Sequence, residues 1–196
     1  MPRHRSEQGK GQGLFTASPE ARLAERFAEA PRTPLIAGTM AVMNDARNIY
    51  AHDRSRVWDE FAVNLSGSRE GLFVAVCTAS TSEEARTAIV KSAQALGYGA
   101  DGVTFVTIDA TGTRLTAPQL IDIVESMDPL CVVAADAGST LLFAEAAQKL
   151  VEPNEPTRLN GREVRAFDDL NELMHTPAGK QRAWALLKTL PSFPRS

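Results

Sequence analysis

The chain has few cysteines and few histidines, and each scarcity removes a class of site. Its 196 residues include two cysteines and three histidines. Cys77 and Cys131 both lie in apolar runs typical of buried strands, so the sequence predicts neither a disulfide framework nor a cysteine metal site. The histidines at His4, His52 and His175 are too scattered for a zinc motif, and we expect neither a metal nor a cofactor.

Excess positive charge and membrane-length segments are also lacking. The formal net charge of -3 gives no overall field that would attract nucleic acid. No apolar segment is long enough to cross a bilayer, and Met1 is followed by polar and glycine residues. The sequence therefore predicts a cytoplasmic protein with no membrane partner. With 43% hydrophobic residues, the chain can bury one substantial core.

The most informative stretch is 72–79, with the sequence Leu-Phe-Val-Ala-Val-Cys-Thr-Ala. A short apolar run of this kind is typical of a strand that is buried on both faces of a sheet. The residues that follow at 80–84, Ser-Thr-Ser-Glu-Glu, contain two overlapping capping boxes. We therefore predict a strand, a tight turn and a helix whose N-cap is Ser80 or Thr81.

The same order of elements recurs along the rest of the chain. Further strands are expected at 103–108, 130–135 and 163–167. Helices are expected at 85–96, 116–127, 140–150 and 177–190, with a polar loop at 151–158. Alternation of this kind predicts an α/β fold with three layers, in which helices cover both faces of a four-stranded parallel sheet.

The residues before this sheet have a different composition. Residues 1–17 are rich in basic and small polar residues, which predicts a flexible basic tail. Residues 18–68 are expected to form extra N-terminal helices packed on the core, the third starting at Asp53 and closed by 66–68. The α/β domain then spans 69–196.

Two glycine-containing motifs resemble phosphate-binding loops. Residues 97–102 spell G-x-G-x-x-G, but they leave a helix and enter a strand, so we interpret them as a simple connecting loop. The motif Asp-Ala-Gly-Ser-Thr at 136–140 follows a strand and precedes a helix. We favour a plain strand-to-helix turn, and keep as the alternative a phosphate or DNA-backbone contact through Gly138, Ser139 and Thr140.

Charged residues near the end of the chain offer two further candidate sites. Asp168 and Asp169 end the fourth strand, where open α/β sheets place their sites, but one of them would serve equally as a helix cap. The segment 177–196 contains no acidic residue. Its charged residues are Lys180, Arg182, Lys188 and Arg195. They form either a solvated helix face or a basic patch, through which any DNA binding would be weak and non-specific.

From Gly71 onward, the order of elements resembles the uracil-DNA glycosylase superfamily, especially its bacterial family-four branch. The closest match is Val-Arg-Ala-Phe-Asp-Asp-Leu-Asn-Glu-Leu at 164–173, followed by Pro177, Lys180 and Trp184. These residues look like that family's final strand, His-Pro-Ala loop and closing helix. The resemblance implies a glycosylase-like fold whose four parallel strands have the order 2-1-3-4.

The positions that carry catalysis in that family hold other residues here. Val76 stands within the segment that replaces the water-activating loop, Val106 replaces the asparagine that reads uracil, and Asp169 replaces the histidine of the His-Pro-Ala loop. The cysteines of the family's iron–sulfur cluster are absent from the sequence. Apolar side chains and a carboxylate cannot bind a flipped base and stabilise departing negative charge. The resemblance therefore implies a non-catalytic relative.

The psi subunits of bacterial DNA polymerase III have a glycosylase-like fold without the chemistry, and the end of the chain is similar to theirs. The shared features are a proline, a basic helix with Trp184, and the closing Ser-Phe-Pro-Arg at 192–195. This resemblance implies a binding or accessory subunit with a protein partner from the replisome or from DNA repair. The alternative is a divergent DNA glycosylase or another hydrolase that acts on a nucleobase.

Overall fold

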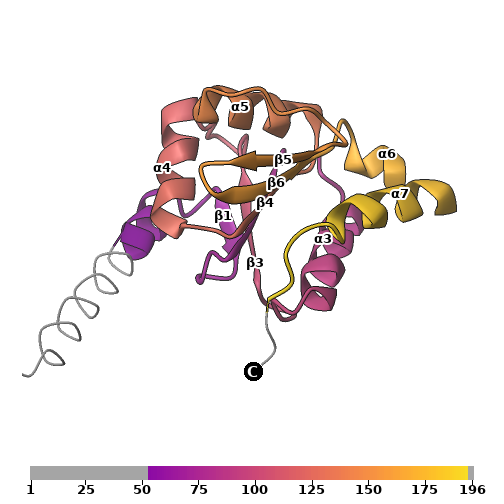
Figure 1. The fold of residues 1–196 in the computed structure, drawn as a ribbon. Helices are drawn as coiled ribbons and strands as arrows, with labels where there is room; N and C mark the ends of the chain where they lie inside the picture. Colours follow the sequence, from indigo (N-terminus) through magenta and orange to yellow (C-terminus); the bar gives the residue numbers. More distant parts are fainter. Residues whose placement is uncertain (1–52, 194–196) are drawn as a thin grey trace, which may run out of the picture. The chain divides into compact units, whose positions relative to one another are not determined.

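The computed structural model describes residues 53–193 of the chain (Figure 1). The predicted basic tail and most of the predicted N-terminal helical segment lie outside the described residues, as does Arg195. Residues 53–60 are helical. The elements that follow are β1 (Leu65–Gly67), β2 (Phe73–Cys77), α3 (Glu83–Ala95), β3 (Val103–Thr107), α4 (Ala117–Met127), β4 (Cys131–Ala134), α5 (Ala137–Ala147), β5 (Pro156–Leu159), β6 (Arg162–Ala166), α6 (Leu170–Met174) and α7 (Pro177–Leu187).

The strands form one six-stranded sheet with the order β1-β3-β2-β4-β6-β5. Neighbours among β3, β2, β4 and β6 pair in parallel, so these strands follow the expected order 2-1-3-4. The two outer strands are antiparallel to their neighbours. The α/β class is confirmed, whereas the prediction of a purely parallel, four-stranded sheet is wrong.

Strand β1 replaces the predicted end of the third N-terminal helix. Val57 and Trp58 are buried on helical residues 53–60, but Leu65 is already paired with Val106 of β3. Gly67 has φ +90, and a side chain there would collide with the carbonyl oxygen of Val103. Glycine therefore allows the close backbone approach that extends the sheet at this edge.

Strand β5 lies in the segment predicted to be a polar loop. It forms a hairpin with β6, and the two residues between the strands are Asn160 and Gly161. Their φ values are 48 and 84, and a two-residue hairpin turn of type I′ requires positive φ at both positions. The Asn-Gly pair is a sequence signal for this hairpin, but only a loop was predicted before the fourth strand.

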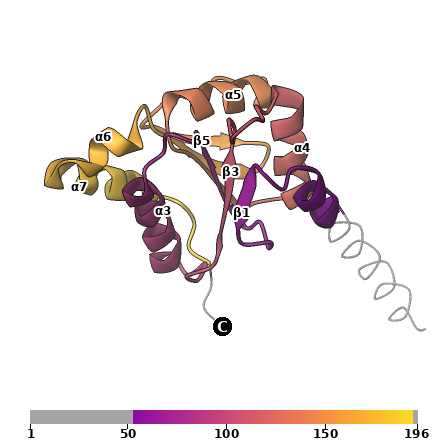
Figure 2. The ribbon, with the colours of Figure 1, turned by 180° about the vertical axis from the view of Figure 1, so that it is seen from behind.

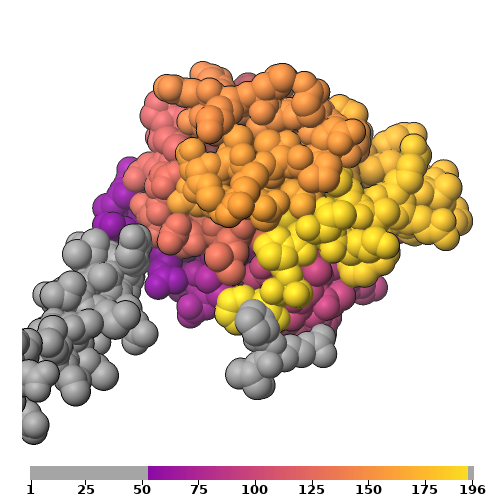
Figure 3. Space-filling model, viewed as in Figure 1, coloured from indigo at the N-terminus to yellow at the C-terminus, as the bar shows by residue number. Residues whose placement is uncertain are grey.

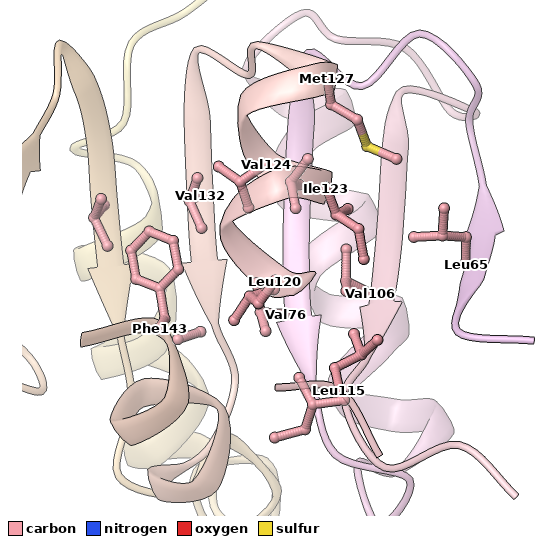
Figure 4. Packing of buried hydrophobic residues seen from close by; sticks show 14 of the residues in the cluster. Leu65, Val76, Val106, Leu115, Leu120, Ile123, Val124, Met127, Val132 and Phe143 are labelled. Carbon is pink, nitrogen blue, oxygen red and sulfur yellow. The ribbon is translucent and has the colours of Figure 1, made fainter. Parts of the chain in front are cut away.

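Helices cover both faces of the sheet (Figures 1 and 2). On β2, Val74 and Val76 point into a core shared with α4 and α5, which Figure 4 shows from close by. The alternate residues Phe73, Ala75 and Cys77 point into a second core shared with α3, α6 and α7. All five side chains are fully buried, as expected of a central parallel strand.

Helix α3 begins two residues later than the earliest predicted start. Its N-cap is Ser82, whose hydroxyl accepts a hydrogen bond from Ala85 N at 3.2 Å. Ser80 and Thr81 are not caps because their hydroxyls bond elsewhere, Ser80 to Thr78 at 2.8 Å and Thr81 to Asp136 at 3.2 Å. The turn after β2 is therefore held by contacts across the sheet edge as well as by its own helix.

The segment after α7 returns to the loop between α3 and β3. Phe193 N donates to the carbonyl oxygen of Leu96 at 2.8 Å, and the Tyr98 hydroxyl donates to Pro191 O at 3.0 Å. The Tyr98 ring also packs edge-on against Phe73, with 5.3 Å between ring centroids. These contacts fix the end of the described chain on the second core.

We expect the protein to lose stability steeply in alkaline solution. Burial raises the pKa of the Cys77 and Cys131 thiols in the folded state. The stability that these neutral thiols contribute is complete below the unfolded pKa of about 8.5 and is lost as the pH rises toward their folded pKa values. The free energy of unfolding, measured with urea, should fall above that pH by up to about 1.4 kcal/mol per pH unit for each thiol.

The variant with Cys77→Ala and Cys131→Ala is the control for this prediction. It should be less stable than the parent at pH 8 because it loses buried volume, but its stability should depend less on pH between about 8.5 and 10. An equally steep decline in the variant would show that groups other than the thiols cause it.

Candidate functional site

The carboxyl ends of the four parallel strands meet at one edge of the sheet, where open α/β folds place their binding sites. Polar side chains gather there from separate loops. Thr78 follows β2, Asp109 follows β3, Asp136 follows β4 and Asp168 follows β6. Asp109 joins two of these loops, because its Oδ1 accepts a hydrogen bond from Ala79 N at 2.6 Å.

Asp136 ties the loop after β2 to the start of α5. Its Oδ2 accepts hydrogen bonds from Thr78 N and Thr78 Oγ1, both at 3.0 Å, and from Thr81 Oγ1 at 3.2 Å. Its Oδ1 accepts from Ser139 N at 2.8 Å, which makes Asp136 the N-cap of α5. Because both carboxylate oxygens are already engaged, this side chain holds two loops together and is not free to act on a substrate.

The motif at 136–140 is a strand-to-helix turn, as favoured from the sequence. Helix α5 starts at Ala137, three residues earlier than predicted, because Asp136 rather than a later residue caps it. Ser139 and Thr140 are buried, and their hydroxyls donate to Asp136 O at 2.9 Å and to Phe167 O at 3.3 Å. An anion at this turn would have to displace those bonds and approach the Asp136 carboxylate.

Gly138 is the one exposed residue of the three proposed for phosphate contact. A side chain at this position would lie 3.2 Å from Thr78 Cγ2 and 3.3 Å from Asp136 Oδ1. The space beside the glycine is therefore bordered by the carboxylate itself. This charge opposes the phosphate contact that the motif alone left open.

The two aspartates after β6 have separate roles. Asp169 is the N-cap of α6, and its Oδ1 accepts a hydrogen bond from Glu172 N at 3.1 Å. Asp168 is exposed, and its Oδ2 accepts from Asn154 Nδ2 at 2.9 Å. Asp169 therefore serves as the helix cap, and Asp168 lies exposed at the edge of the sheet.

The three positions singled out by the glycosylase resemblance do not lie together. Val76 and Val106 are fully buried and are register partners on adjacent strands. Both lie in the core beneath α4, as Figure 4 shows. Asp169 is exposed at the end of β6. The two valines are therefore core residues of the sheet, whereas Asp169 lies at the surface.

A cavity of about 620 Å³ lies between the end of β6, α6 and α7, and we call it the α6–α7 groove. Figure 3 shows the surface on this side of the molecule, with α7 in yellow. The groove is lined by Asn154, Phe167, Asp168, Asp169, Glu172, Leu173, Arg182, Ala185, Leu186 and Thr189. Of these, only Asp168, Asp169 and Arg182 were candidate site residues in the sequence.

One face of α7 forms a wall of this groove. Arg182, Ala185 and Leu186 of α7 line it, with Thr189 in the turn just after the helix, and their spacing of i, i+3, i+4 and i+7 is that of a single helix face. The opposite wall carries Asp169 of the α6 cap. The spacing of these residues in the sequence was a signal for this face, but only the basic residues of the segment were considered as a candidate site.

The predicted basic patch is divided in the structure. Lys180 Nζ lies 2.8 Å from Glu84 Oε1 of α3, and this contact lowers the pKa of Glu84. Arg182 lies in the α6–α7 groove beside acidic residues, and Lys188 is exposed. The segment is free of acid only in the linear sequence, because folding brings carboxylates from α3 and α6 to it.

Residues 53–193 contain no group of three or more histidine, cysteine, aspartate or glutamate side chains placed to hold a metal ion. His175 is exposed after α6, and the other two histidines lie outside this range. None of the helices described in the same range has the length and apolar character needed to cross a bilayer.

No protein-family model and no curated protein matches the chain. Function therefore has to be inferred from the sheet edge and from the α6–α7 groove.

Proposed function

We propose that the chain is a non-catalytic protein with a uracil-DNA glycosylase-like fold that acts as a binding or accessory subunit in DNA replication or repair. The proposal that the protein is non-catalytic rests on the hydrogen-bond network around Asp136 at the carboxyl edge of the sheet. The carboxylate of Asp136 accepts hydrogen bonds from Thr78, Thr81 and Ser139, so both of its oxygens and these donors are already engaged. A hydrolase needs such groups directed at a substrate.

The assignment to replication or repair rests on the sequence resemblance. The order of the four parallel strands agrees with the order that this resemblance implies, and this agreement supports the proposal. The edge strands β1 and β5 are additions to that pattern. A shared arrangement of strands supports a fold but does not by itself give a function.

One observation favours the alternative, a divergent glycosylase or another hydrolase that acts on a nucleobase. Asp168 is an exposed carboxylate on the wall of a 620 Å³ cavity, which is a suitable setting for a general base. No histidine lines this cavity among the described residues, and Asp169 beside it is held as a helix cap. We therefore rank binding above catalysis.

We expect the full chain to release neither uracil nor hypoxanthine from labelled single-stranded or double-stranded DNA. The reason is that Val76 and Val106 are buried in the core and that the polar groups at the sheet edge bond to one another. The assay compares the parent with Asp168→Ala and Asp169→Ala. Release above background that disappears in either variant would establish the hydrolase instead.

The binding role is tested by affinity capture from the native cell with the full chain as bait. Recovery of replisome or repair proteins, lost on competition with untagged protein, is the expected result. Specific recovery of a metabolic complex, with no replication or repair protein, would overturn the assignment to DNA metabolism.

A further inference from the structure

We propose that the α6–α7 groove binds a partner peptide in which an apolar side chain stands next to an arginine or lysine. This inference rests on the proposed function and deepens it, because it names the chemistry of the partner that a binding subunit would take. The supporting observations are the length of the groove, its apolar floor and the negative charge of its rim.

The floor of the groove is apolar and short. Phe167, Leu173, Ala185 and Leu186 contribute carbon surface between the two helices. From Arg182 of α7 to Thr189 in the turn after it, the lining residues span seven positions, or about 10 Å at the helical rise of 1.5 Å per residue. This length matches about three residues of an extended peptide at roughly 3.3 Å each. The groove therefore suits one or two apolar side chains of a short segment.

The rim of the groove is acidic. Asp168, Asp169 and Glu172 are exposed there, and Arg182 is the one cationic residue among the described residues that line the groove, so these four side chains have a net charge of -2. Lys180 does not offset this charge, because it pairs with Glu84 in a separate cavity on the other side of α7. Complementary charge favours a basic partner here and disfavours DNA phosphates.

The carboxylates also retain hydrogen-bonding capacity. Asp168 uses Oδ2 to accept from Asn154, and Asp169 uses Oδ1 to cap α6. Among the described residues, no donor is bonded to the second oxygen of either side chain. An arginine carries five N–H donors in a planar fork that suits carboxylate oxygens. A basic residue of the peptide can therefore bond to the rim without breaking the contacts that hold α6.

The test uses ¹⁵N-labelled full chain and two capped tripeptide probes, acetyl-Leu-Leu-Arg-amide and acetyl-Leu-Leu-Glu-amide, titrated to millimolar concentration. We expect the arginine probe to shift the amide signals of residues that line the groove, among them Leu173 and Ala185, and the glutamate probe to shift them much less. The proposal is overturned if the arginine probe leaves these signals in place, or if both probes bind equally.

Two double variants separate the charge of the groove from the overall charge of the protein. Asp168→Asn together with Glu172→Gln should weaken binding of the arginine probe about threefold to tenfold, since exposed charge pairs contribute modestly. Glu145→Gln with Asp101→Asn removes the same charge from exposed sites outside the groove and should leave binding unchanged. Equal weakening by both pairs would show attraction by overall charge only, and would overturn a specific site.

Ala185→Trp tests the shape of the groove because the indole would fill it. This variant should abolish the shifts while keeping the dispersed spectrum of a folded protein. Undiminished binding to a folded Ala185→Trp protein would contradict the proposal.

The outcomes also separate this proposal from the proposed function. If the probes fail to bind but replisome or repair proteins are still captured, peptide binding in the groove is refuted and the proposed function stands. If the arginine probe binds but DNA bases are also released, the groove stands and the non-catalytic assignment fails.

Discussion

The substitution Val106→Asn should destabilise the protein by about 3–5 kcal/mol and should give no uracil release. Val106 is fully buried in β3 and packs in the core beneath α4 (Figure 4). Losing a buried valine costs roughly 1.5–3 kcal/mol, and burying an amide without partners adds about 1–3 kcal/mol. Introducing the asparagine of an active glycosylase here would therefore damage the core without creating a site.

The free energy of unfolding, measured with urea at neutral pH, checks this prediction, and Val106→Ala is the matched control. Alanine leaves a cavity but adds no polar group, so a loss of about 2 kcal/mol is expected. The additional loss in Val106→Asn measures the buried amide. If asparagine costs no more than alanine, or if it confers base release, the position faces a polar pocket rather than the core.

Asp136→Ala should be the second most damaging of these substitutions, with an expected loss of roughly 2–4 kcal/mol. The carboxylate caps α5 through Ser139 N, and a lost cap of this kind costs about 0.5–2 kcal/mol. It also accepts from the backbone N–H of Thr78 and from two hydroxyls, so its removal leaves these donors without their partner. Each unsatisfied buried donor adds about 1–3 kcal/mol, and water that enters the site would reduce the total.

Asp109→Ala provides the comparison, because Asp109 also joins two loops at the same edge. Its exposed carboxylate accepts one hydrogen bond among the described residues, from Ala79 N. We therefore expect the free energy of unfolding to fall by about 1 kcal/mol. Urea unfolding of both variants gives the difference. Equal losses for the two aspartates would mean that the network around Asp136 contributes little beyond one hydrogen bond.

The parallel part of the sheet follows from local sequence because each strand and its following helix carry their own pattern. The run at 72–79 and the run at 130–135 are apolar enough to indicate buried strands without any knowledge of their neighbours. The edge strands lack such a pattern. β1 has three residues and pairs with β3, which is distant in sequence, whereas β5 has four residues and pairs with the adjacent strand β6. Their existence depends on tertiary context more than on composition.

The candidate site was less predictable for a related reason. Asp169 was identified as a possible helix cap because capping is a local signal. The pairing of Lys180 with Glu84 and the presence of Arg182 and Glu172 in one groove depend on how α7 packs against α3 and α6, which no local pattern specifies. Burial of Val76 was predicted from its apolar run and is confirmed, whereas its assignment to a former active site came only from the sequence resemblance.

The antiparallel strands that flank the parallel ones also bear on aggregation. A long strand left at the edge of a sheet offers unpaired backbone groups to other chains. Here β1 is only three residues long, and β5 presents Pro156, which has no N–H to donate, and the exposed charge of Arg158. Short length, proline and charge all hinder pairing between edges of separate molecules. The strands β3 and β6, which β1 and β5 cover, are thereby shielded from intermolecular sheet growth.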